Sequence, residues 1–149
     1  MTEDEFRILH SKLIEQCIYL EDILRRYFCL VVSKNKFEEY LVHLDKVDDN
    51  TMGQLINCYK NSNADFSFPS DFIEKIEEAK DIRNFYAHNV FYKRVPIRHG
   101  VVQNVDAERL KKSYNKLIML YDDFAEIYDK KYEELKSLEK NNDGKYRKV

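Results

Sequence analysis

Apolar residues in the first 33 positions of the chain recur at steps of three or four, which is the period of one face of an α-helix. Thr2 and Glu5 have the spacing of a capping box, so the helix is expected to begin there, and the polar run 33–36 is expected to end it. The stripe consists of Phe6, Leu9, Leu13, Cys17, Leu20, Leu24, Tyr27 and Val31. It predicts one continuous helix of about eight turns.

The middle of the chain carries shorter apolar groups, which predict two short helices. Residues 37–44 hold the first group, and the polar run 48–50 closes it. Thr51 is placed to cap a second short helix, which carries Leu55, Ile56 and Tyr59. Residues 61–69 then form a polar loop.

Two longer helices are expected in the second half of the chain. Ser70 and Asp71 precede an apolar-periodic stretch, which predicts a helix that runs to about Phe91. Residues 92–106 form a connection whose apolar members also fit a small hairpin, namely Val95, Ile97, Val101 and Val102. A last helix is expected from about Ala107, with a stripe of Leu110, Tyr114, Leu117, Tyr121, Phe124 and Tyr128.

The chain has only three glycines and two prolines in 149 residues. A sheet-rich fold needs many tight turns, and the residues that form them are scarce here. The pattern predicts an all-α protein that forms an antiparallel bundle of four or five helices. A small hairpin before the last helix is compatible with this fold. Residues 1–136 are expected to form a single domain and residues 137–149 a polar C-terminal tail. The three glycines fit no glycine-rich phosphate-binding loop.

Charge and cysteine content narrow the class of protein. The net charge of −2 gives no overall basic field, so any contact with nucleic acid is expected to be local. The acidic N-terminus differs from a signal peptide, and the longest apolar run, residues 27–32, is too short to span a bilayer. The three cysteines have no C-x-x-C or zinc-ligand spacing, which favours a cytoplasmic protein with reduced thiols, no metal and no cofactor.

One segment, residues 82–91, does not fit a simple core helix. On an α-helix Arg83 falls in the middle of an apolar stripe made of Phe72, Ile76, Ala79, Tyr86 and Val90. Ile82, Phe85 and Phe91 lie off that stripe, so the helix end is apolar nearly all round and is expected to be buried on all sides. In a small bundle a second copy of the protein would supply this cover, which predicts a homodimer through this helix.

Three polar groups, Arg83, Asn84 and His88, lie within this apolar helix end. Asn84 and His88 share a face, so the amide can fix the imidazole tautomer. Arg83 and His88 are about 140° apart on an α-helix and do not face each other, but the long arginine can bend toward a ligand held between them. An imidazole that titrates near neutral pH and a planar cation suffice for attack by a ribose 2′-hydroxyl on its own phosphate, without a metal.

Basic and aromatic residues follow this motif on the connection. A local basic patch there can hold a phosphate chain beside His88, and aromatic rings can stack on bases. The sequence therefore predicts RNA contacts for Tyr92, Lys93, Arg94 and Arg98.

The run from Arg83 to His88 resembles the R-x4-6-H signature of the HEPN superfamily, including an Asn directly after the Arg. The resemblance implies a four- or five-helix antiparallel bundle and a homodimer that joins two motifs in one cleft. It implies a metal-independent endoribonuclease that leaves a cyclic phosphate, acting as a toxin with an antitoxin partner or in defence against phage. In one subfamily a tyrosine two residues after the histidine is modified with AMP, and that position is Val90 here.

Other interpretations of these residues remain open. Arg83 can form a structural ion pair with a carboxylate of a neighbouring helix, and His88 can be a core histidine that bonds to a carbonyl. The chain would then be a non-catalytic HEPN-type module that binds nucleotide or RNA, or one that only dimerises. The basic residues of the connection can equally belong to a solvated loop, and His10 is expected to be a packing or rim residue of the first helix.

Overall fold

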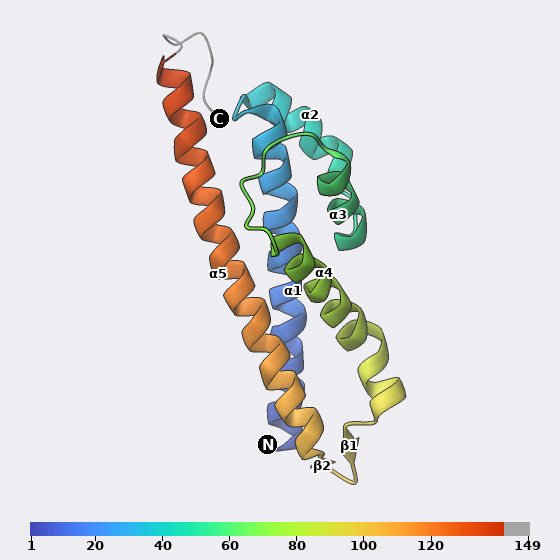
Figure 1. The fold of residues 1–149 in the computed structure, drawn as a ribbon. Coiled ribbons are helices and arrows are strands. Elements are labelled where there is room, and N and C mark those ends of the chain that lie inside the picture. The colour runs from blue at the N-terminus through green and yellow to red at the C-terminus, as the bar shows by residue number, and fades with distance from the viewer. Residues whose placement is uncertain (142–149) are drawn as a thin grey trace. The chain divides into compact units, whose positions relative to one another are not determined.

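The computed structural model describes residues 1–141, except for the side chains of residues 92–94 and 139–141. This part of the chain is mainly helical, as predicted, and its only sheet has two short strands (Figure 1). The elements are α1 (Glu3–Ser33), α2 (Phe37–Val47), α3 (Met52–Asn61), α4 (Phe72–Asn84), the π-helix η1 (Phe85–Arg94), β1 (Ile97–Arg98), β2 (Val101–Val102) and α5 (Asn104–Asn141).

Two predicted helix starts, at Thr2 and at Thr51, are confirmed by their caps. The Thr2 hydroxyl accepts a hydrogen bond from the Glu5 backbone N–H at 3.1 Å, and the Glu5 carboxylate accepts one from the Thr2 N–H at 3.4 Å. Thr51 and Gln54 form the same reciprocal pair at the start of α3. These bonds satisfy backbone donors that a helix otherwise leaves unpaired. The stripe of α1 is buried along its whole length, apart from the half-buried Leu9.

The chain forms two compact units, and each unit is built from two separate parts of the sequence. The first unit contains residues 1–20 and 74–121, and the second contains residues 21–73 and the chain from residue 122 onward. Helices α1 and α5 contribute to both units. The single domain expected over residues 1–136 stays a prediction.

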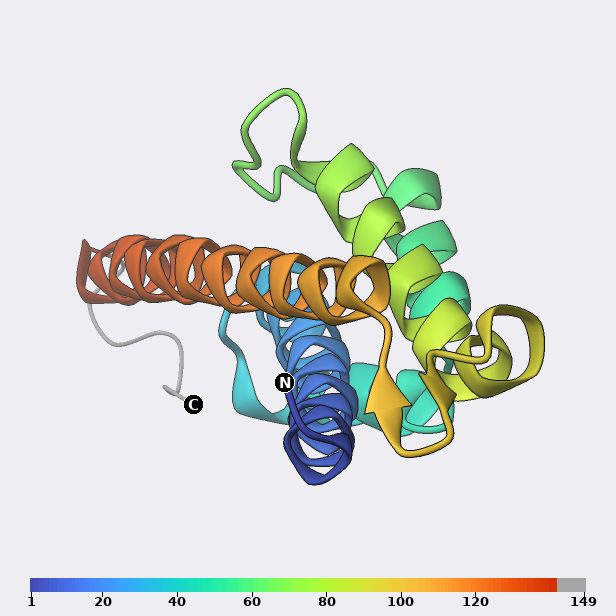
Figure 2. The same cartoon turned by 90° about the horizontal axis from the view of Figure 1, so that it is seen from below.

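In the first unit, α4 and η1 run in the opposite direction to the first half of α1 (Figure 1). The β1–β2 hairpin connects η1 to the start of α5 (Figure 2). In that hairpin Ile97 pairs with Val102 and Arg98 with Val101, and Val101 also forms a bridge to Thr2. The hairpin therefore joins the end of η1 to the beginning of α1.

The second unit contains a cluster of aromatic side chains around Tyr27. The Tyr27 hydroxyl donates to the Phe66 carbonyl, and the Tyr59 hydroxyl donates to the Leu24 carbonyl. These bonds satisfy the polar ends of two buried rings, and burial raises the pKa of both tyrosines. Further rings complete the cluster, among them Phe68, Phe72 and Phe124.

Two helices differ from their predicted form. The helix expected from residue 70 to about Phe91 is an α-helix only to Asn84 and continues as a π-helix to Arg94. Helix α5 begins at Asn104 rather than near Ala107 and reaches Asn141, so residues 137–141 of the expected tail are helical, and residues 142–149 lie outside the described part. Within residues 1–141 no helix has an apolar stretch long enough to cross a membrane.

Candidate functional site

The Arg83–His88 motif spans the junction between α4 and η1. Arg83 and Asn84 end the α-helix, and the next four residues are the first four of the π-helix. A π-helix bonds residue i to i+5 instead of i+4, is rare, and occurs frequently at functional sites. The π-helix could not be predicted from the sequence, because over so short a distance its apolar stripe resembles that of an α-helix.

The π-helix changes the angle between Arg83 and His88. An α-helix advances by 100° per residue, whereas a π-helix of about 4.4 residues per turn advances by about 80°. Three of the five steps from Arg83 to His88 lie in η1. On ideal helix geometry the angle about the axis between the two side chains is therefore about 80° rather than the expected 140° or so. With this geometry the cation and the imidazole lie closer to a common face than an α-helix would place them.

The three candidate catalytic residues are accessible. Arg83 is half-buried, and Asn84 and His88 are exposed. Within the described residues, the Arg83 guanidinium has no ion pair with a carboxylate. Among the described residues of this single chain, Arg83 therefore has no structural ion pair and His88 is not a core histidine.

One expected interaction is missing from the part of the chain that the structure describes. No hydrogen bond joins the Asn84 amide to the His88 imidazole, so the expected fixing of the tautomer by Asn84 is not observed. Ala87, His88 and Phe91 are exposed in this single chain, and the prediction that a second copy covers this helix end stays a prediction. The inward stripe is confirmed, since Phe72, Ile76, Ala79, Tyr86 and Val90 are each at most 3% exposed.

Helix α1 contacts η1 through His10. The His10 Nε2 atom lies 2.7 Å from the Tyr86 carbonyl oxygen, and its ring centroid is 5.2 Å from that of Phe91. A carbonyl oxygen only accepts hydrogen bonds, so Nε2 carries the proton. The prediction that His10 packs at the rim of the helix face is confirmed, but its bond to η1 had no signal in the sequence.

Two arginines that the sequence analysis did not single out lie over rings of η1. The Arg7 guanidinium in α1 is 5.5 Å from the centroid of the Phe91 ring, and the Arg109 guanidinium in α5 is 4.5 Å from that of Phe85. Cation–π contacts of this kind are expected to be modest at exposed positions. They add positive charge on both sides of the segment that carries His88.

The connection after η1 holds the predicted RNA-binding residues. The side chains of Tyr92, Lys93 and Arg94 lie outside the described part. Arg98 is exposed on β1, and the turn that follows has positive φ angles at His99 (54°) and Gly100 (75°). Two successive positive φ angles are the geometry of a type I′ hairpin turn, which presents Arg98 at the edge of a rigid loop.

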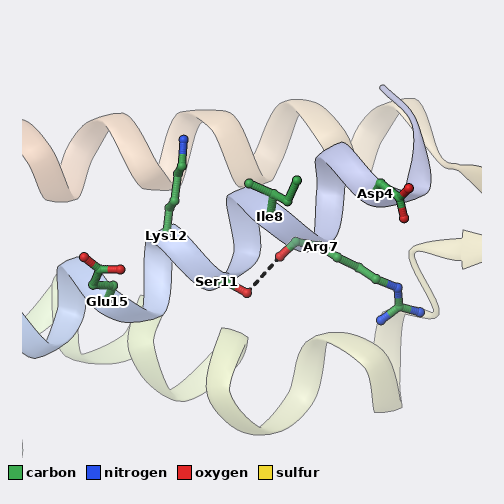
Figure 3. Close-up of a pocket in the computed structure, with 6 residues that line it drawn as sticks. All are labelled: Asp4, Arg7, Ile8, Ser11, Lys12 and Glu15. Carbon is green, nitrogen blue, oxygen red and sulfur yellow. Dashed lines mark hydrogen bonds between the residues drawn. The ribbon is translucent and has the colours of Figure 1, made fainter.

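A shallow hollow lies on the surface of α1 (Figure 3). It is lined by Asp4, Arg7, Ile8, Ser11, Lys12 and Glu15, all from the first turns of that helix. It carries two acidic and two basic side chains, and none of the predicted site residues contributes. The hollow therefore has no charge pattern that would select a phosphate.

Within residues 1–141 no three His, Cys, Asp or Glu side chains come together in an arrangement that could hold a metal ion. Comparison of the chain with protein-family models, with curated proteins and with solved structures finds no match. The residues of the motif and their geometry therefore carry the functional proposal by themselves.

Proposed function

We propose that this protein is a HEPN-type, metal-independent endoribonuclease. The observation that carries the proposal is the position of His88, which is exposed on a π-helix five residues after an arginine that has no ion pair in the described part of the chain. The Arg83 guanidinium is therefore available to an anionic substrate, which would supply the missing partner.

The proposed reaction is an attack by the ribose 2′-oxygen on the adjacent phosphorus. The His88 imidazole accepts the proton of the 2′-hydroxyl, a new P–O2′ bond forms, and the P–O5′ bond breaks. The departing 5′-oxygen takes up a proton from solvent water, and the protonated His88 returns its proton to the resulting hydroxide, which leaves a 2′,3′-cyclic phosphate and a free 5′-hydroxyl. The Arg83 guanidinium stabilises negative charge on the phosphoryl oxygens, and Asn84 helps to position the phosphate.

Substrate access would involve the connection after η1. Arg98 on β1, together with Tyr92, Lys93 and Arg94, would hold the RNA chain beside the motif. The exposed outer face at the end of α4 and along η1, formed by Asn84, Ala87, His88 and Phe91, is the surface through which two copies would meet. A homodimer of this kind would join two motifs, as the HEPN resemblance implies.

The test is cleavage of single-stranded RNA in the presence of EDTA. We expect the wild-type protein to cut and His88→Ala and Arg83→Ala to lose most of that activity. His43→Ala and Arg26→Ala are matched controls, since they remove the same side chains outside the proposed site. Absence of cleavage by the wild type, or equal cleavage by all variants, contradicts the proposal.

The biological role that we propose is a toxin or anti-phage component controlled by an antitoxin protein. Expression in a bacterial host is then expected to stop growth, and His88→Ala is expected to remove that effect. Equal growth arrest by the two proteins would contradict a role that depends on RNA cleavage.

A second candidate is a non-catalytic module that binds RNA or a nucleotide, or that dimerises. The missing hydrogen bond between Asn84 and His88 favours it, because a general base is usually held by an orienting partner. Under this candidate His88→Ala changes ligand affinity or stability only. Binding of RNA by the wild type with no cleavage would support it over the endoribonuclease.

A further inference from the structure

His10 contacts both ends of one turn of the π-helix. Its Nε2 donates to the Tyr86 carbonyl at 2.7 Å, and its ring meets the Phe91 ring edge-on, with 5.2 Å between centroids and 66° between planes. Tyr86 and Phe91 are five residues apart, which is the spacing that a π-helical hydrogen bond joins. His88 lies between them.

The Phe91 end of this turn has further contacts with α1. The Phe6 ring packs edge-on against the Phe91 ring, with 6.2 Å between their centroids. The Arg7 guanidinium lies over the Phe91 ring, 5.5 Å from its centroid. Phe91 is nevertheless 43% exposed, so these contacts hold the ring at the surface rather than in the core. At the Tyr86 end, His10 bonds to the backbone carbonyl.

We propose that His10 is a positioning residue, which holds the π-helical turn from Tyr86 to Phe91 and thereby sets the direction of His88 relative to Arg83. An α-helical turn is the ordinary alternative for this segment. In α-helical geometry the angle about the helix axis between Arg83 and His88 would be about 140°. The catalytic consequence rests on the proposed endoribonuclease function, whereas the structural role of His10 does not.

The structural role is tested by amide hydrogen exchange of residues 86–94 in the protein without RNA. His10→Phe keeps a ring against Phe91 but removes the donor, and His10→Gln keeps an N–H donor. We expect His10→Phe to speed exchange in η1 by about 2- to 10-fold, the effect of losing one hydrogen bond, with α3 unchanged. His10→Gln should restore part of the protection, and His43→Phe is the matched control.

Unchanged exchange in η1 of His10→Phe overturns the proposal. If His10→Phe does not fold, Phe91→Leu provides a second route, because it removes the ring contact at the exposed end of the same turn. We expect Phe91→Leu to speed exchange in η1 as well, and protection equal to that of the wild type would again overturn the role of this contact.

The catalytic consequence is tested with RNA. We expect His10→Phe to lower kcat by about 2- to 10-fold, because the direction of His88 is less well fixed, with KM unchanged, and His10→Gln to recover part of kcat. Faster exchange with an unchanged kcat would show that His10 holds the turn but does not set the direction of His88. Absence of cleavage by the wild type would refute the proposed function, while the exchange experiment would still decide whether His10 holds the turn.

Discussion

The guanidinium of Arg109 in α5 lies over the ring of Phe85, the first residue of η1, with 4.5 Å between Cζ and the ring centroid. Phe85 directly follows Asn84, so this contact joins α5 to the point where the α-helix becomes a π-helix. On the other side His10 of α1 holds Tyr86. The turn that carries His88 is therefore attached to two helices that lie far from it in the sequence.

The Arg109–Phe85 contact is expected to contribute to stability. Arg109→Ala should lower the free energy of unfolding by about 0.5–1 kcal/mol, the usual size of an exposed cation–π pair. Denaturant unfolding of Arg109→Ala, Phe85→Leu and the double variant measures the coupling. Additive losses in the double variant would mean that the two side chains do not interact in solution.

Arg83 is expected to matter for activity more than for stability. Loss of a group that stabilises charge on the reacting phosphate typically costs about 10²–10³-fold in kcat, so Arg83→Ala should fall in that range. Arg83→Lys should recover only part, because an ammonium lacks the planar pair of donors. Single-turnover cleavage of RNA measures both variants.

The same variants separate the catalytic role from a structural one. Arg83 has no ion pair in the described part of the chain, so Arg83→Ala should unfold at nearly the denaturant concentration of the wild type. Removal of one partner from a buried ion pair usually costs about 3–5 kcal/mol. A loss of that size would identify Arg83 as a structural residue.

Burial of Cys29 is expected to make stability depend on pH in the alkaline range. Burial raises the pKa of the Cys29 thiol from 9.0 to about 11. Between these values the unfolded chain has lost the thiol proton and the folded chain retains it, so the free energy of unfolding falls as pH rises from about 9 to about 11. Denaturant unfolding at several pH values measures the fall. Cys29→Ala should show a smaller decline, and an identical decline would contradict this assignment.

The helix starts and the inward faces could be predicted because their signals are local. Thr2 with Glu5, and Thr51 with Gln54, show their capping geometry within four residues of sequence. The stripe of α4 and η1 was also predictable, since burial selects apolar side chains at positions such as Ile76 and Val90.

The geometry of the site could not be predicted in the same way. Two of its contacts join residues far apart in the chain, since His10 bonds to Tyr86 and Arg109 lies over Phe85. Over a single turn, no local sequence pattern distinguishes a π-helix from an α-helix. The angle between Arg83 and His88 depends on that difference, so the motif was visible in the sequence but its arrangement was not.

Arg98 offers a test of the proposed RNA path that does not depend on catalysis. It is exposed on β1 beside a type I′ turn, so it can reach a phosphate without rearrangement of the core. Each phosphate contact with single-stranded nucleic acid contributes about −0.7 to the slope of log K against log salt. Arg98→Ala should therefore weaken RNA binding by His88→Ala protein, which is expected not to cut, and reduce the slope by about that amount. Arg26→Ala, which removes an exposed arginine of α1, should leave the slope unchanged. Equal slopes for the Arg98 and Arg26 variants would place the RNA elsewhere on the protein.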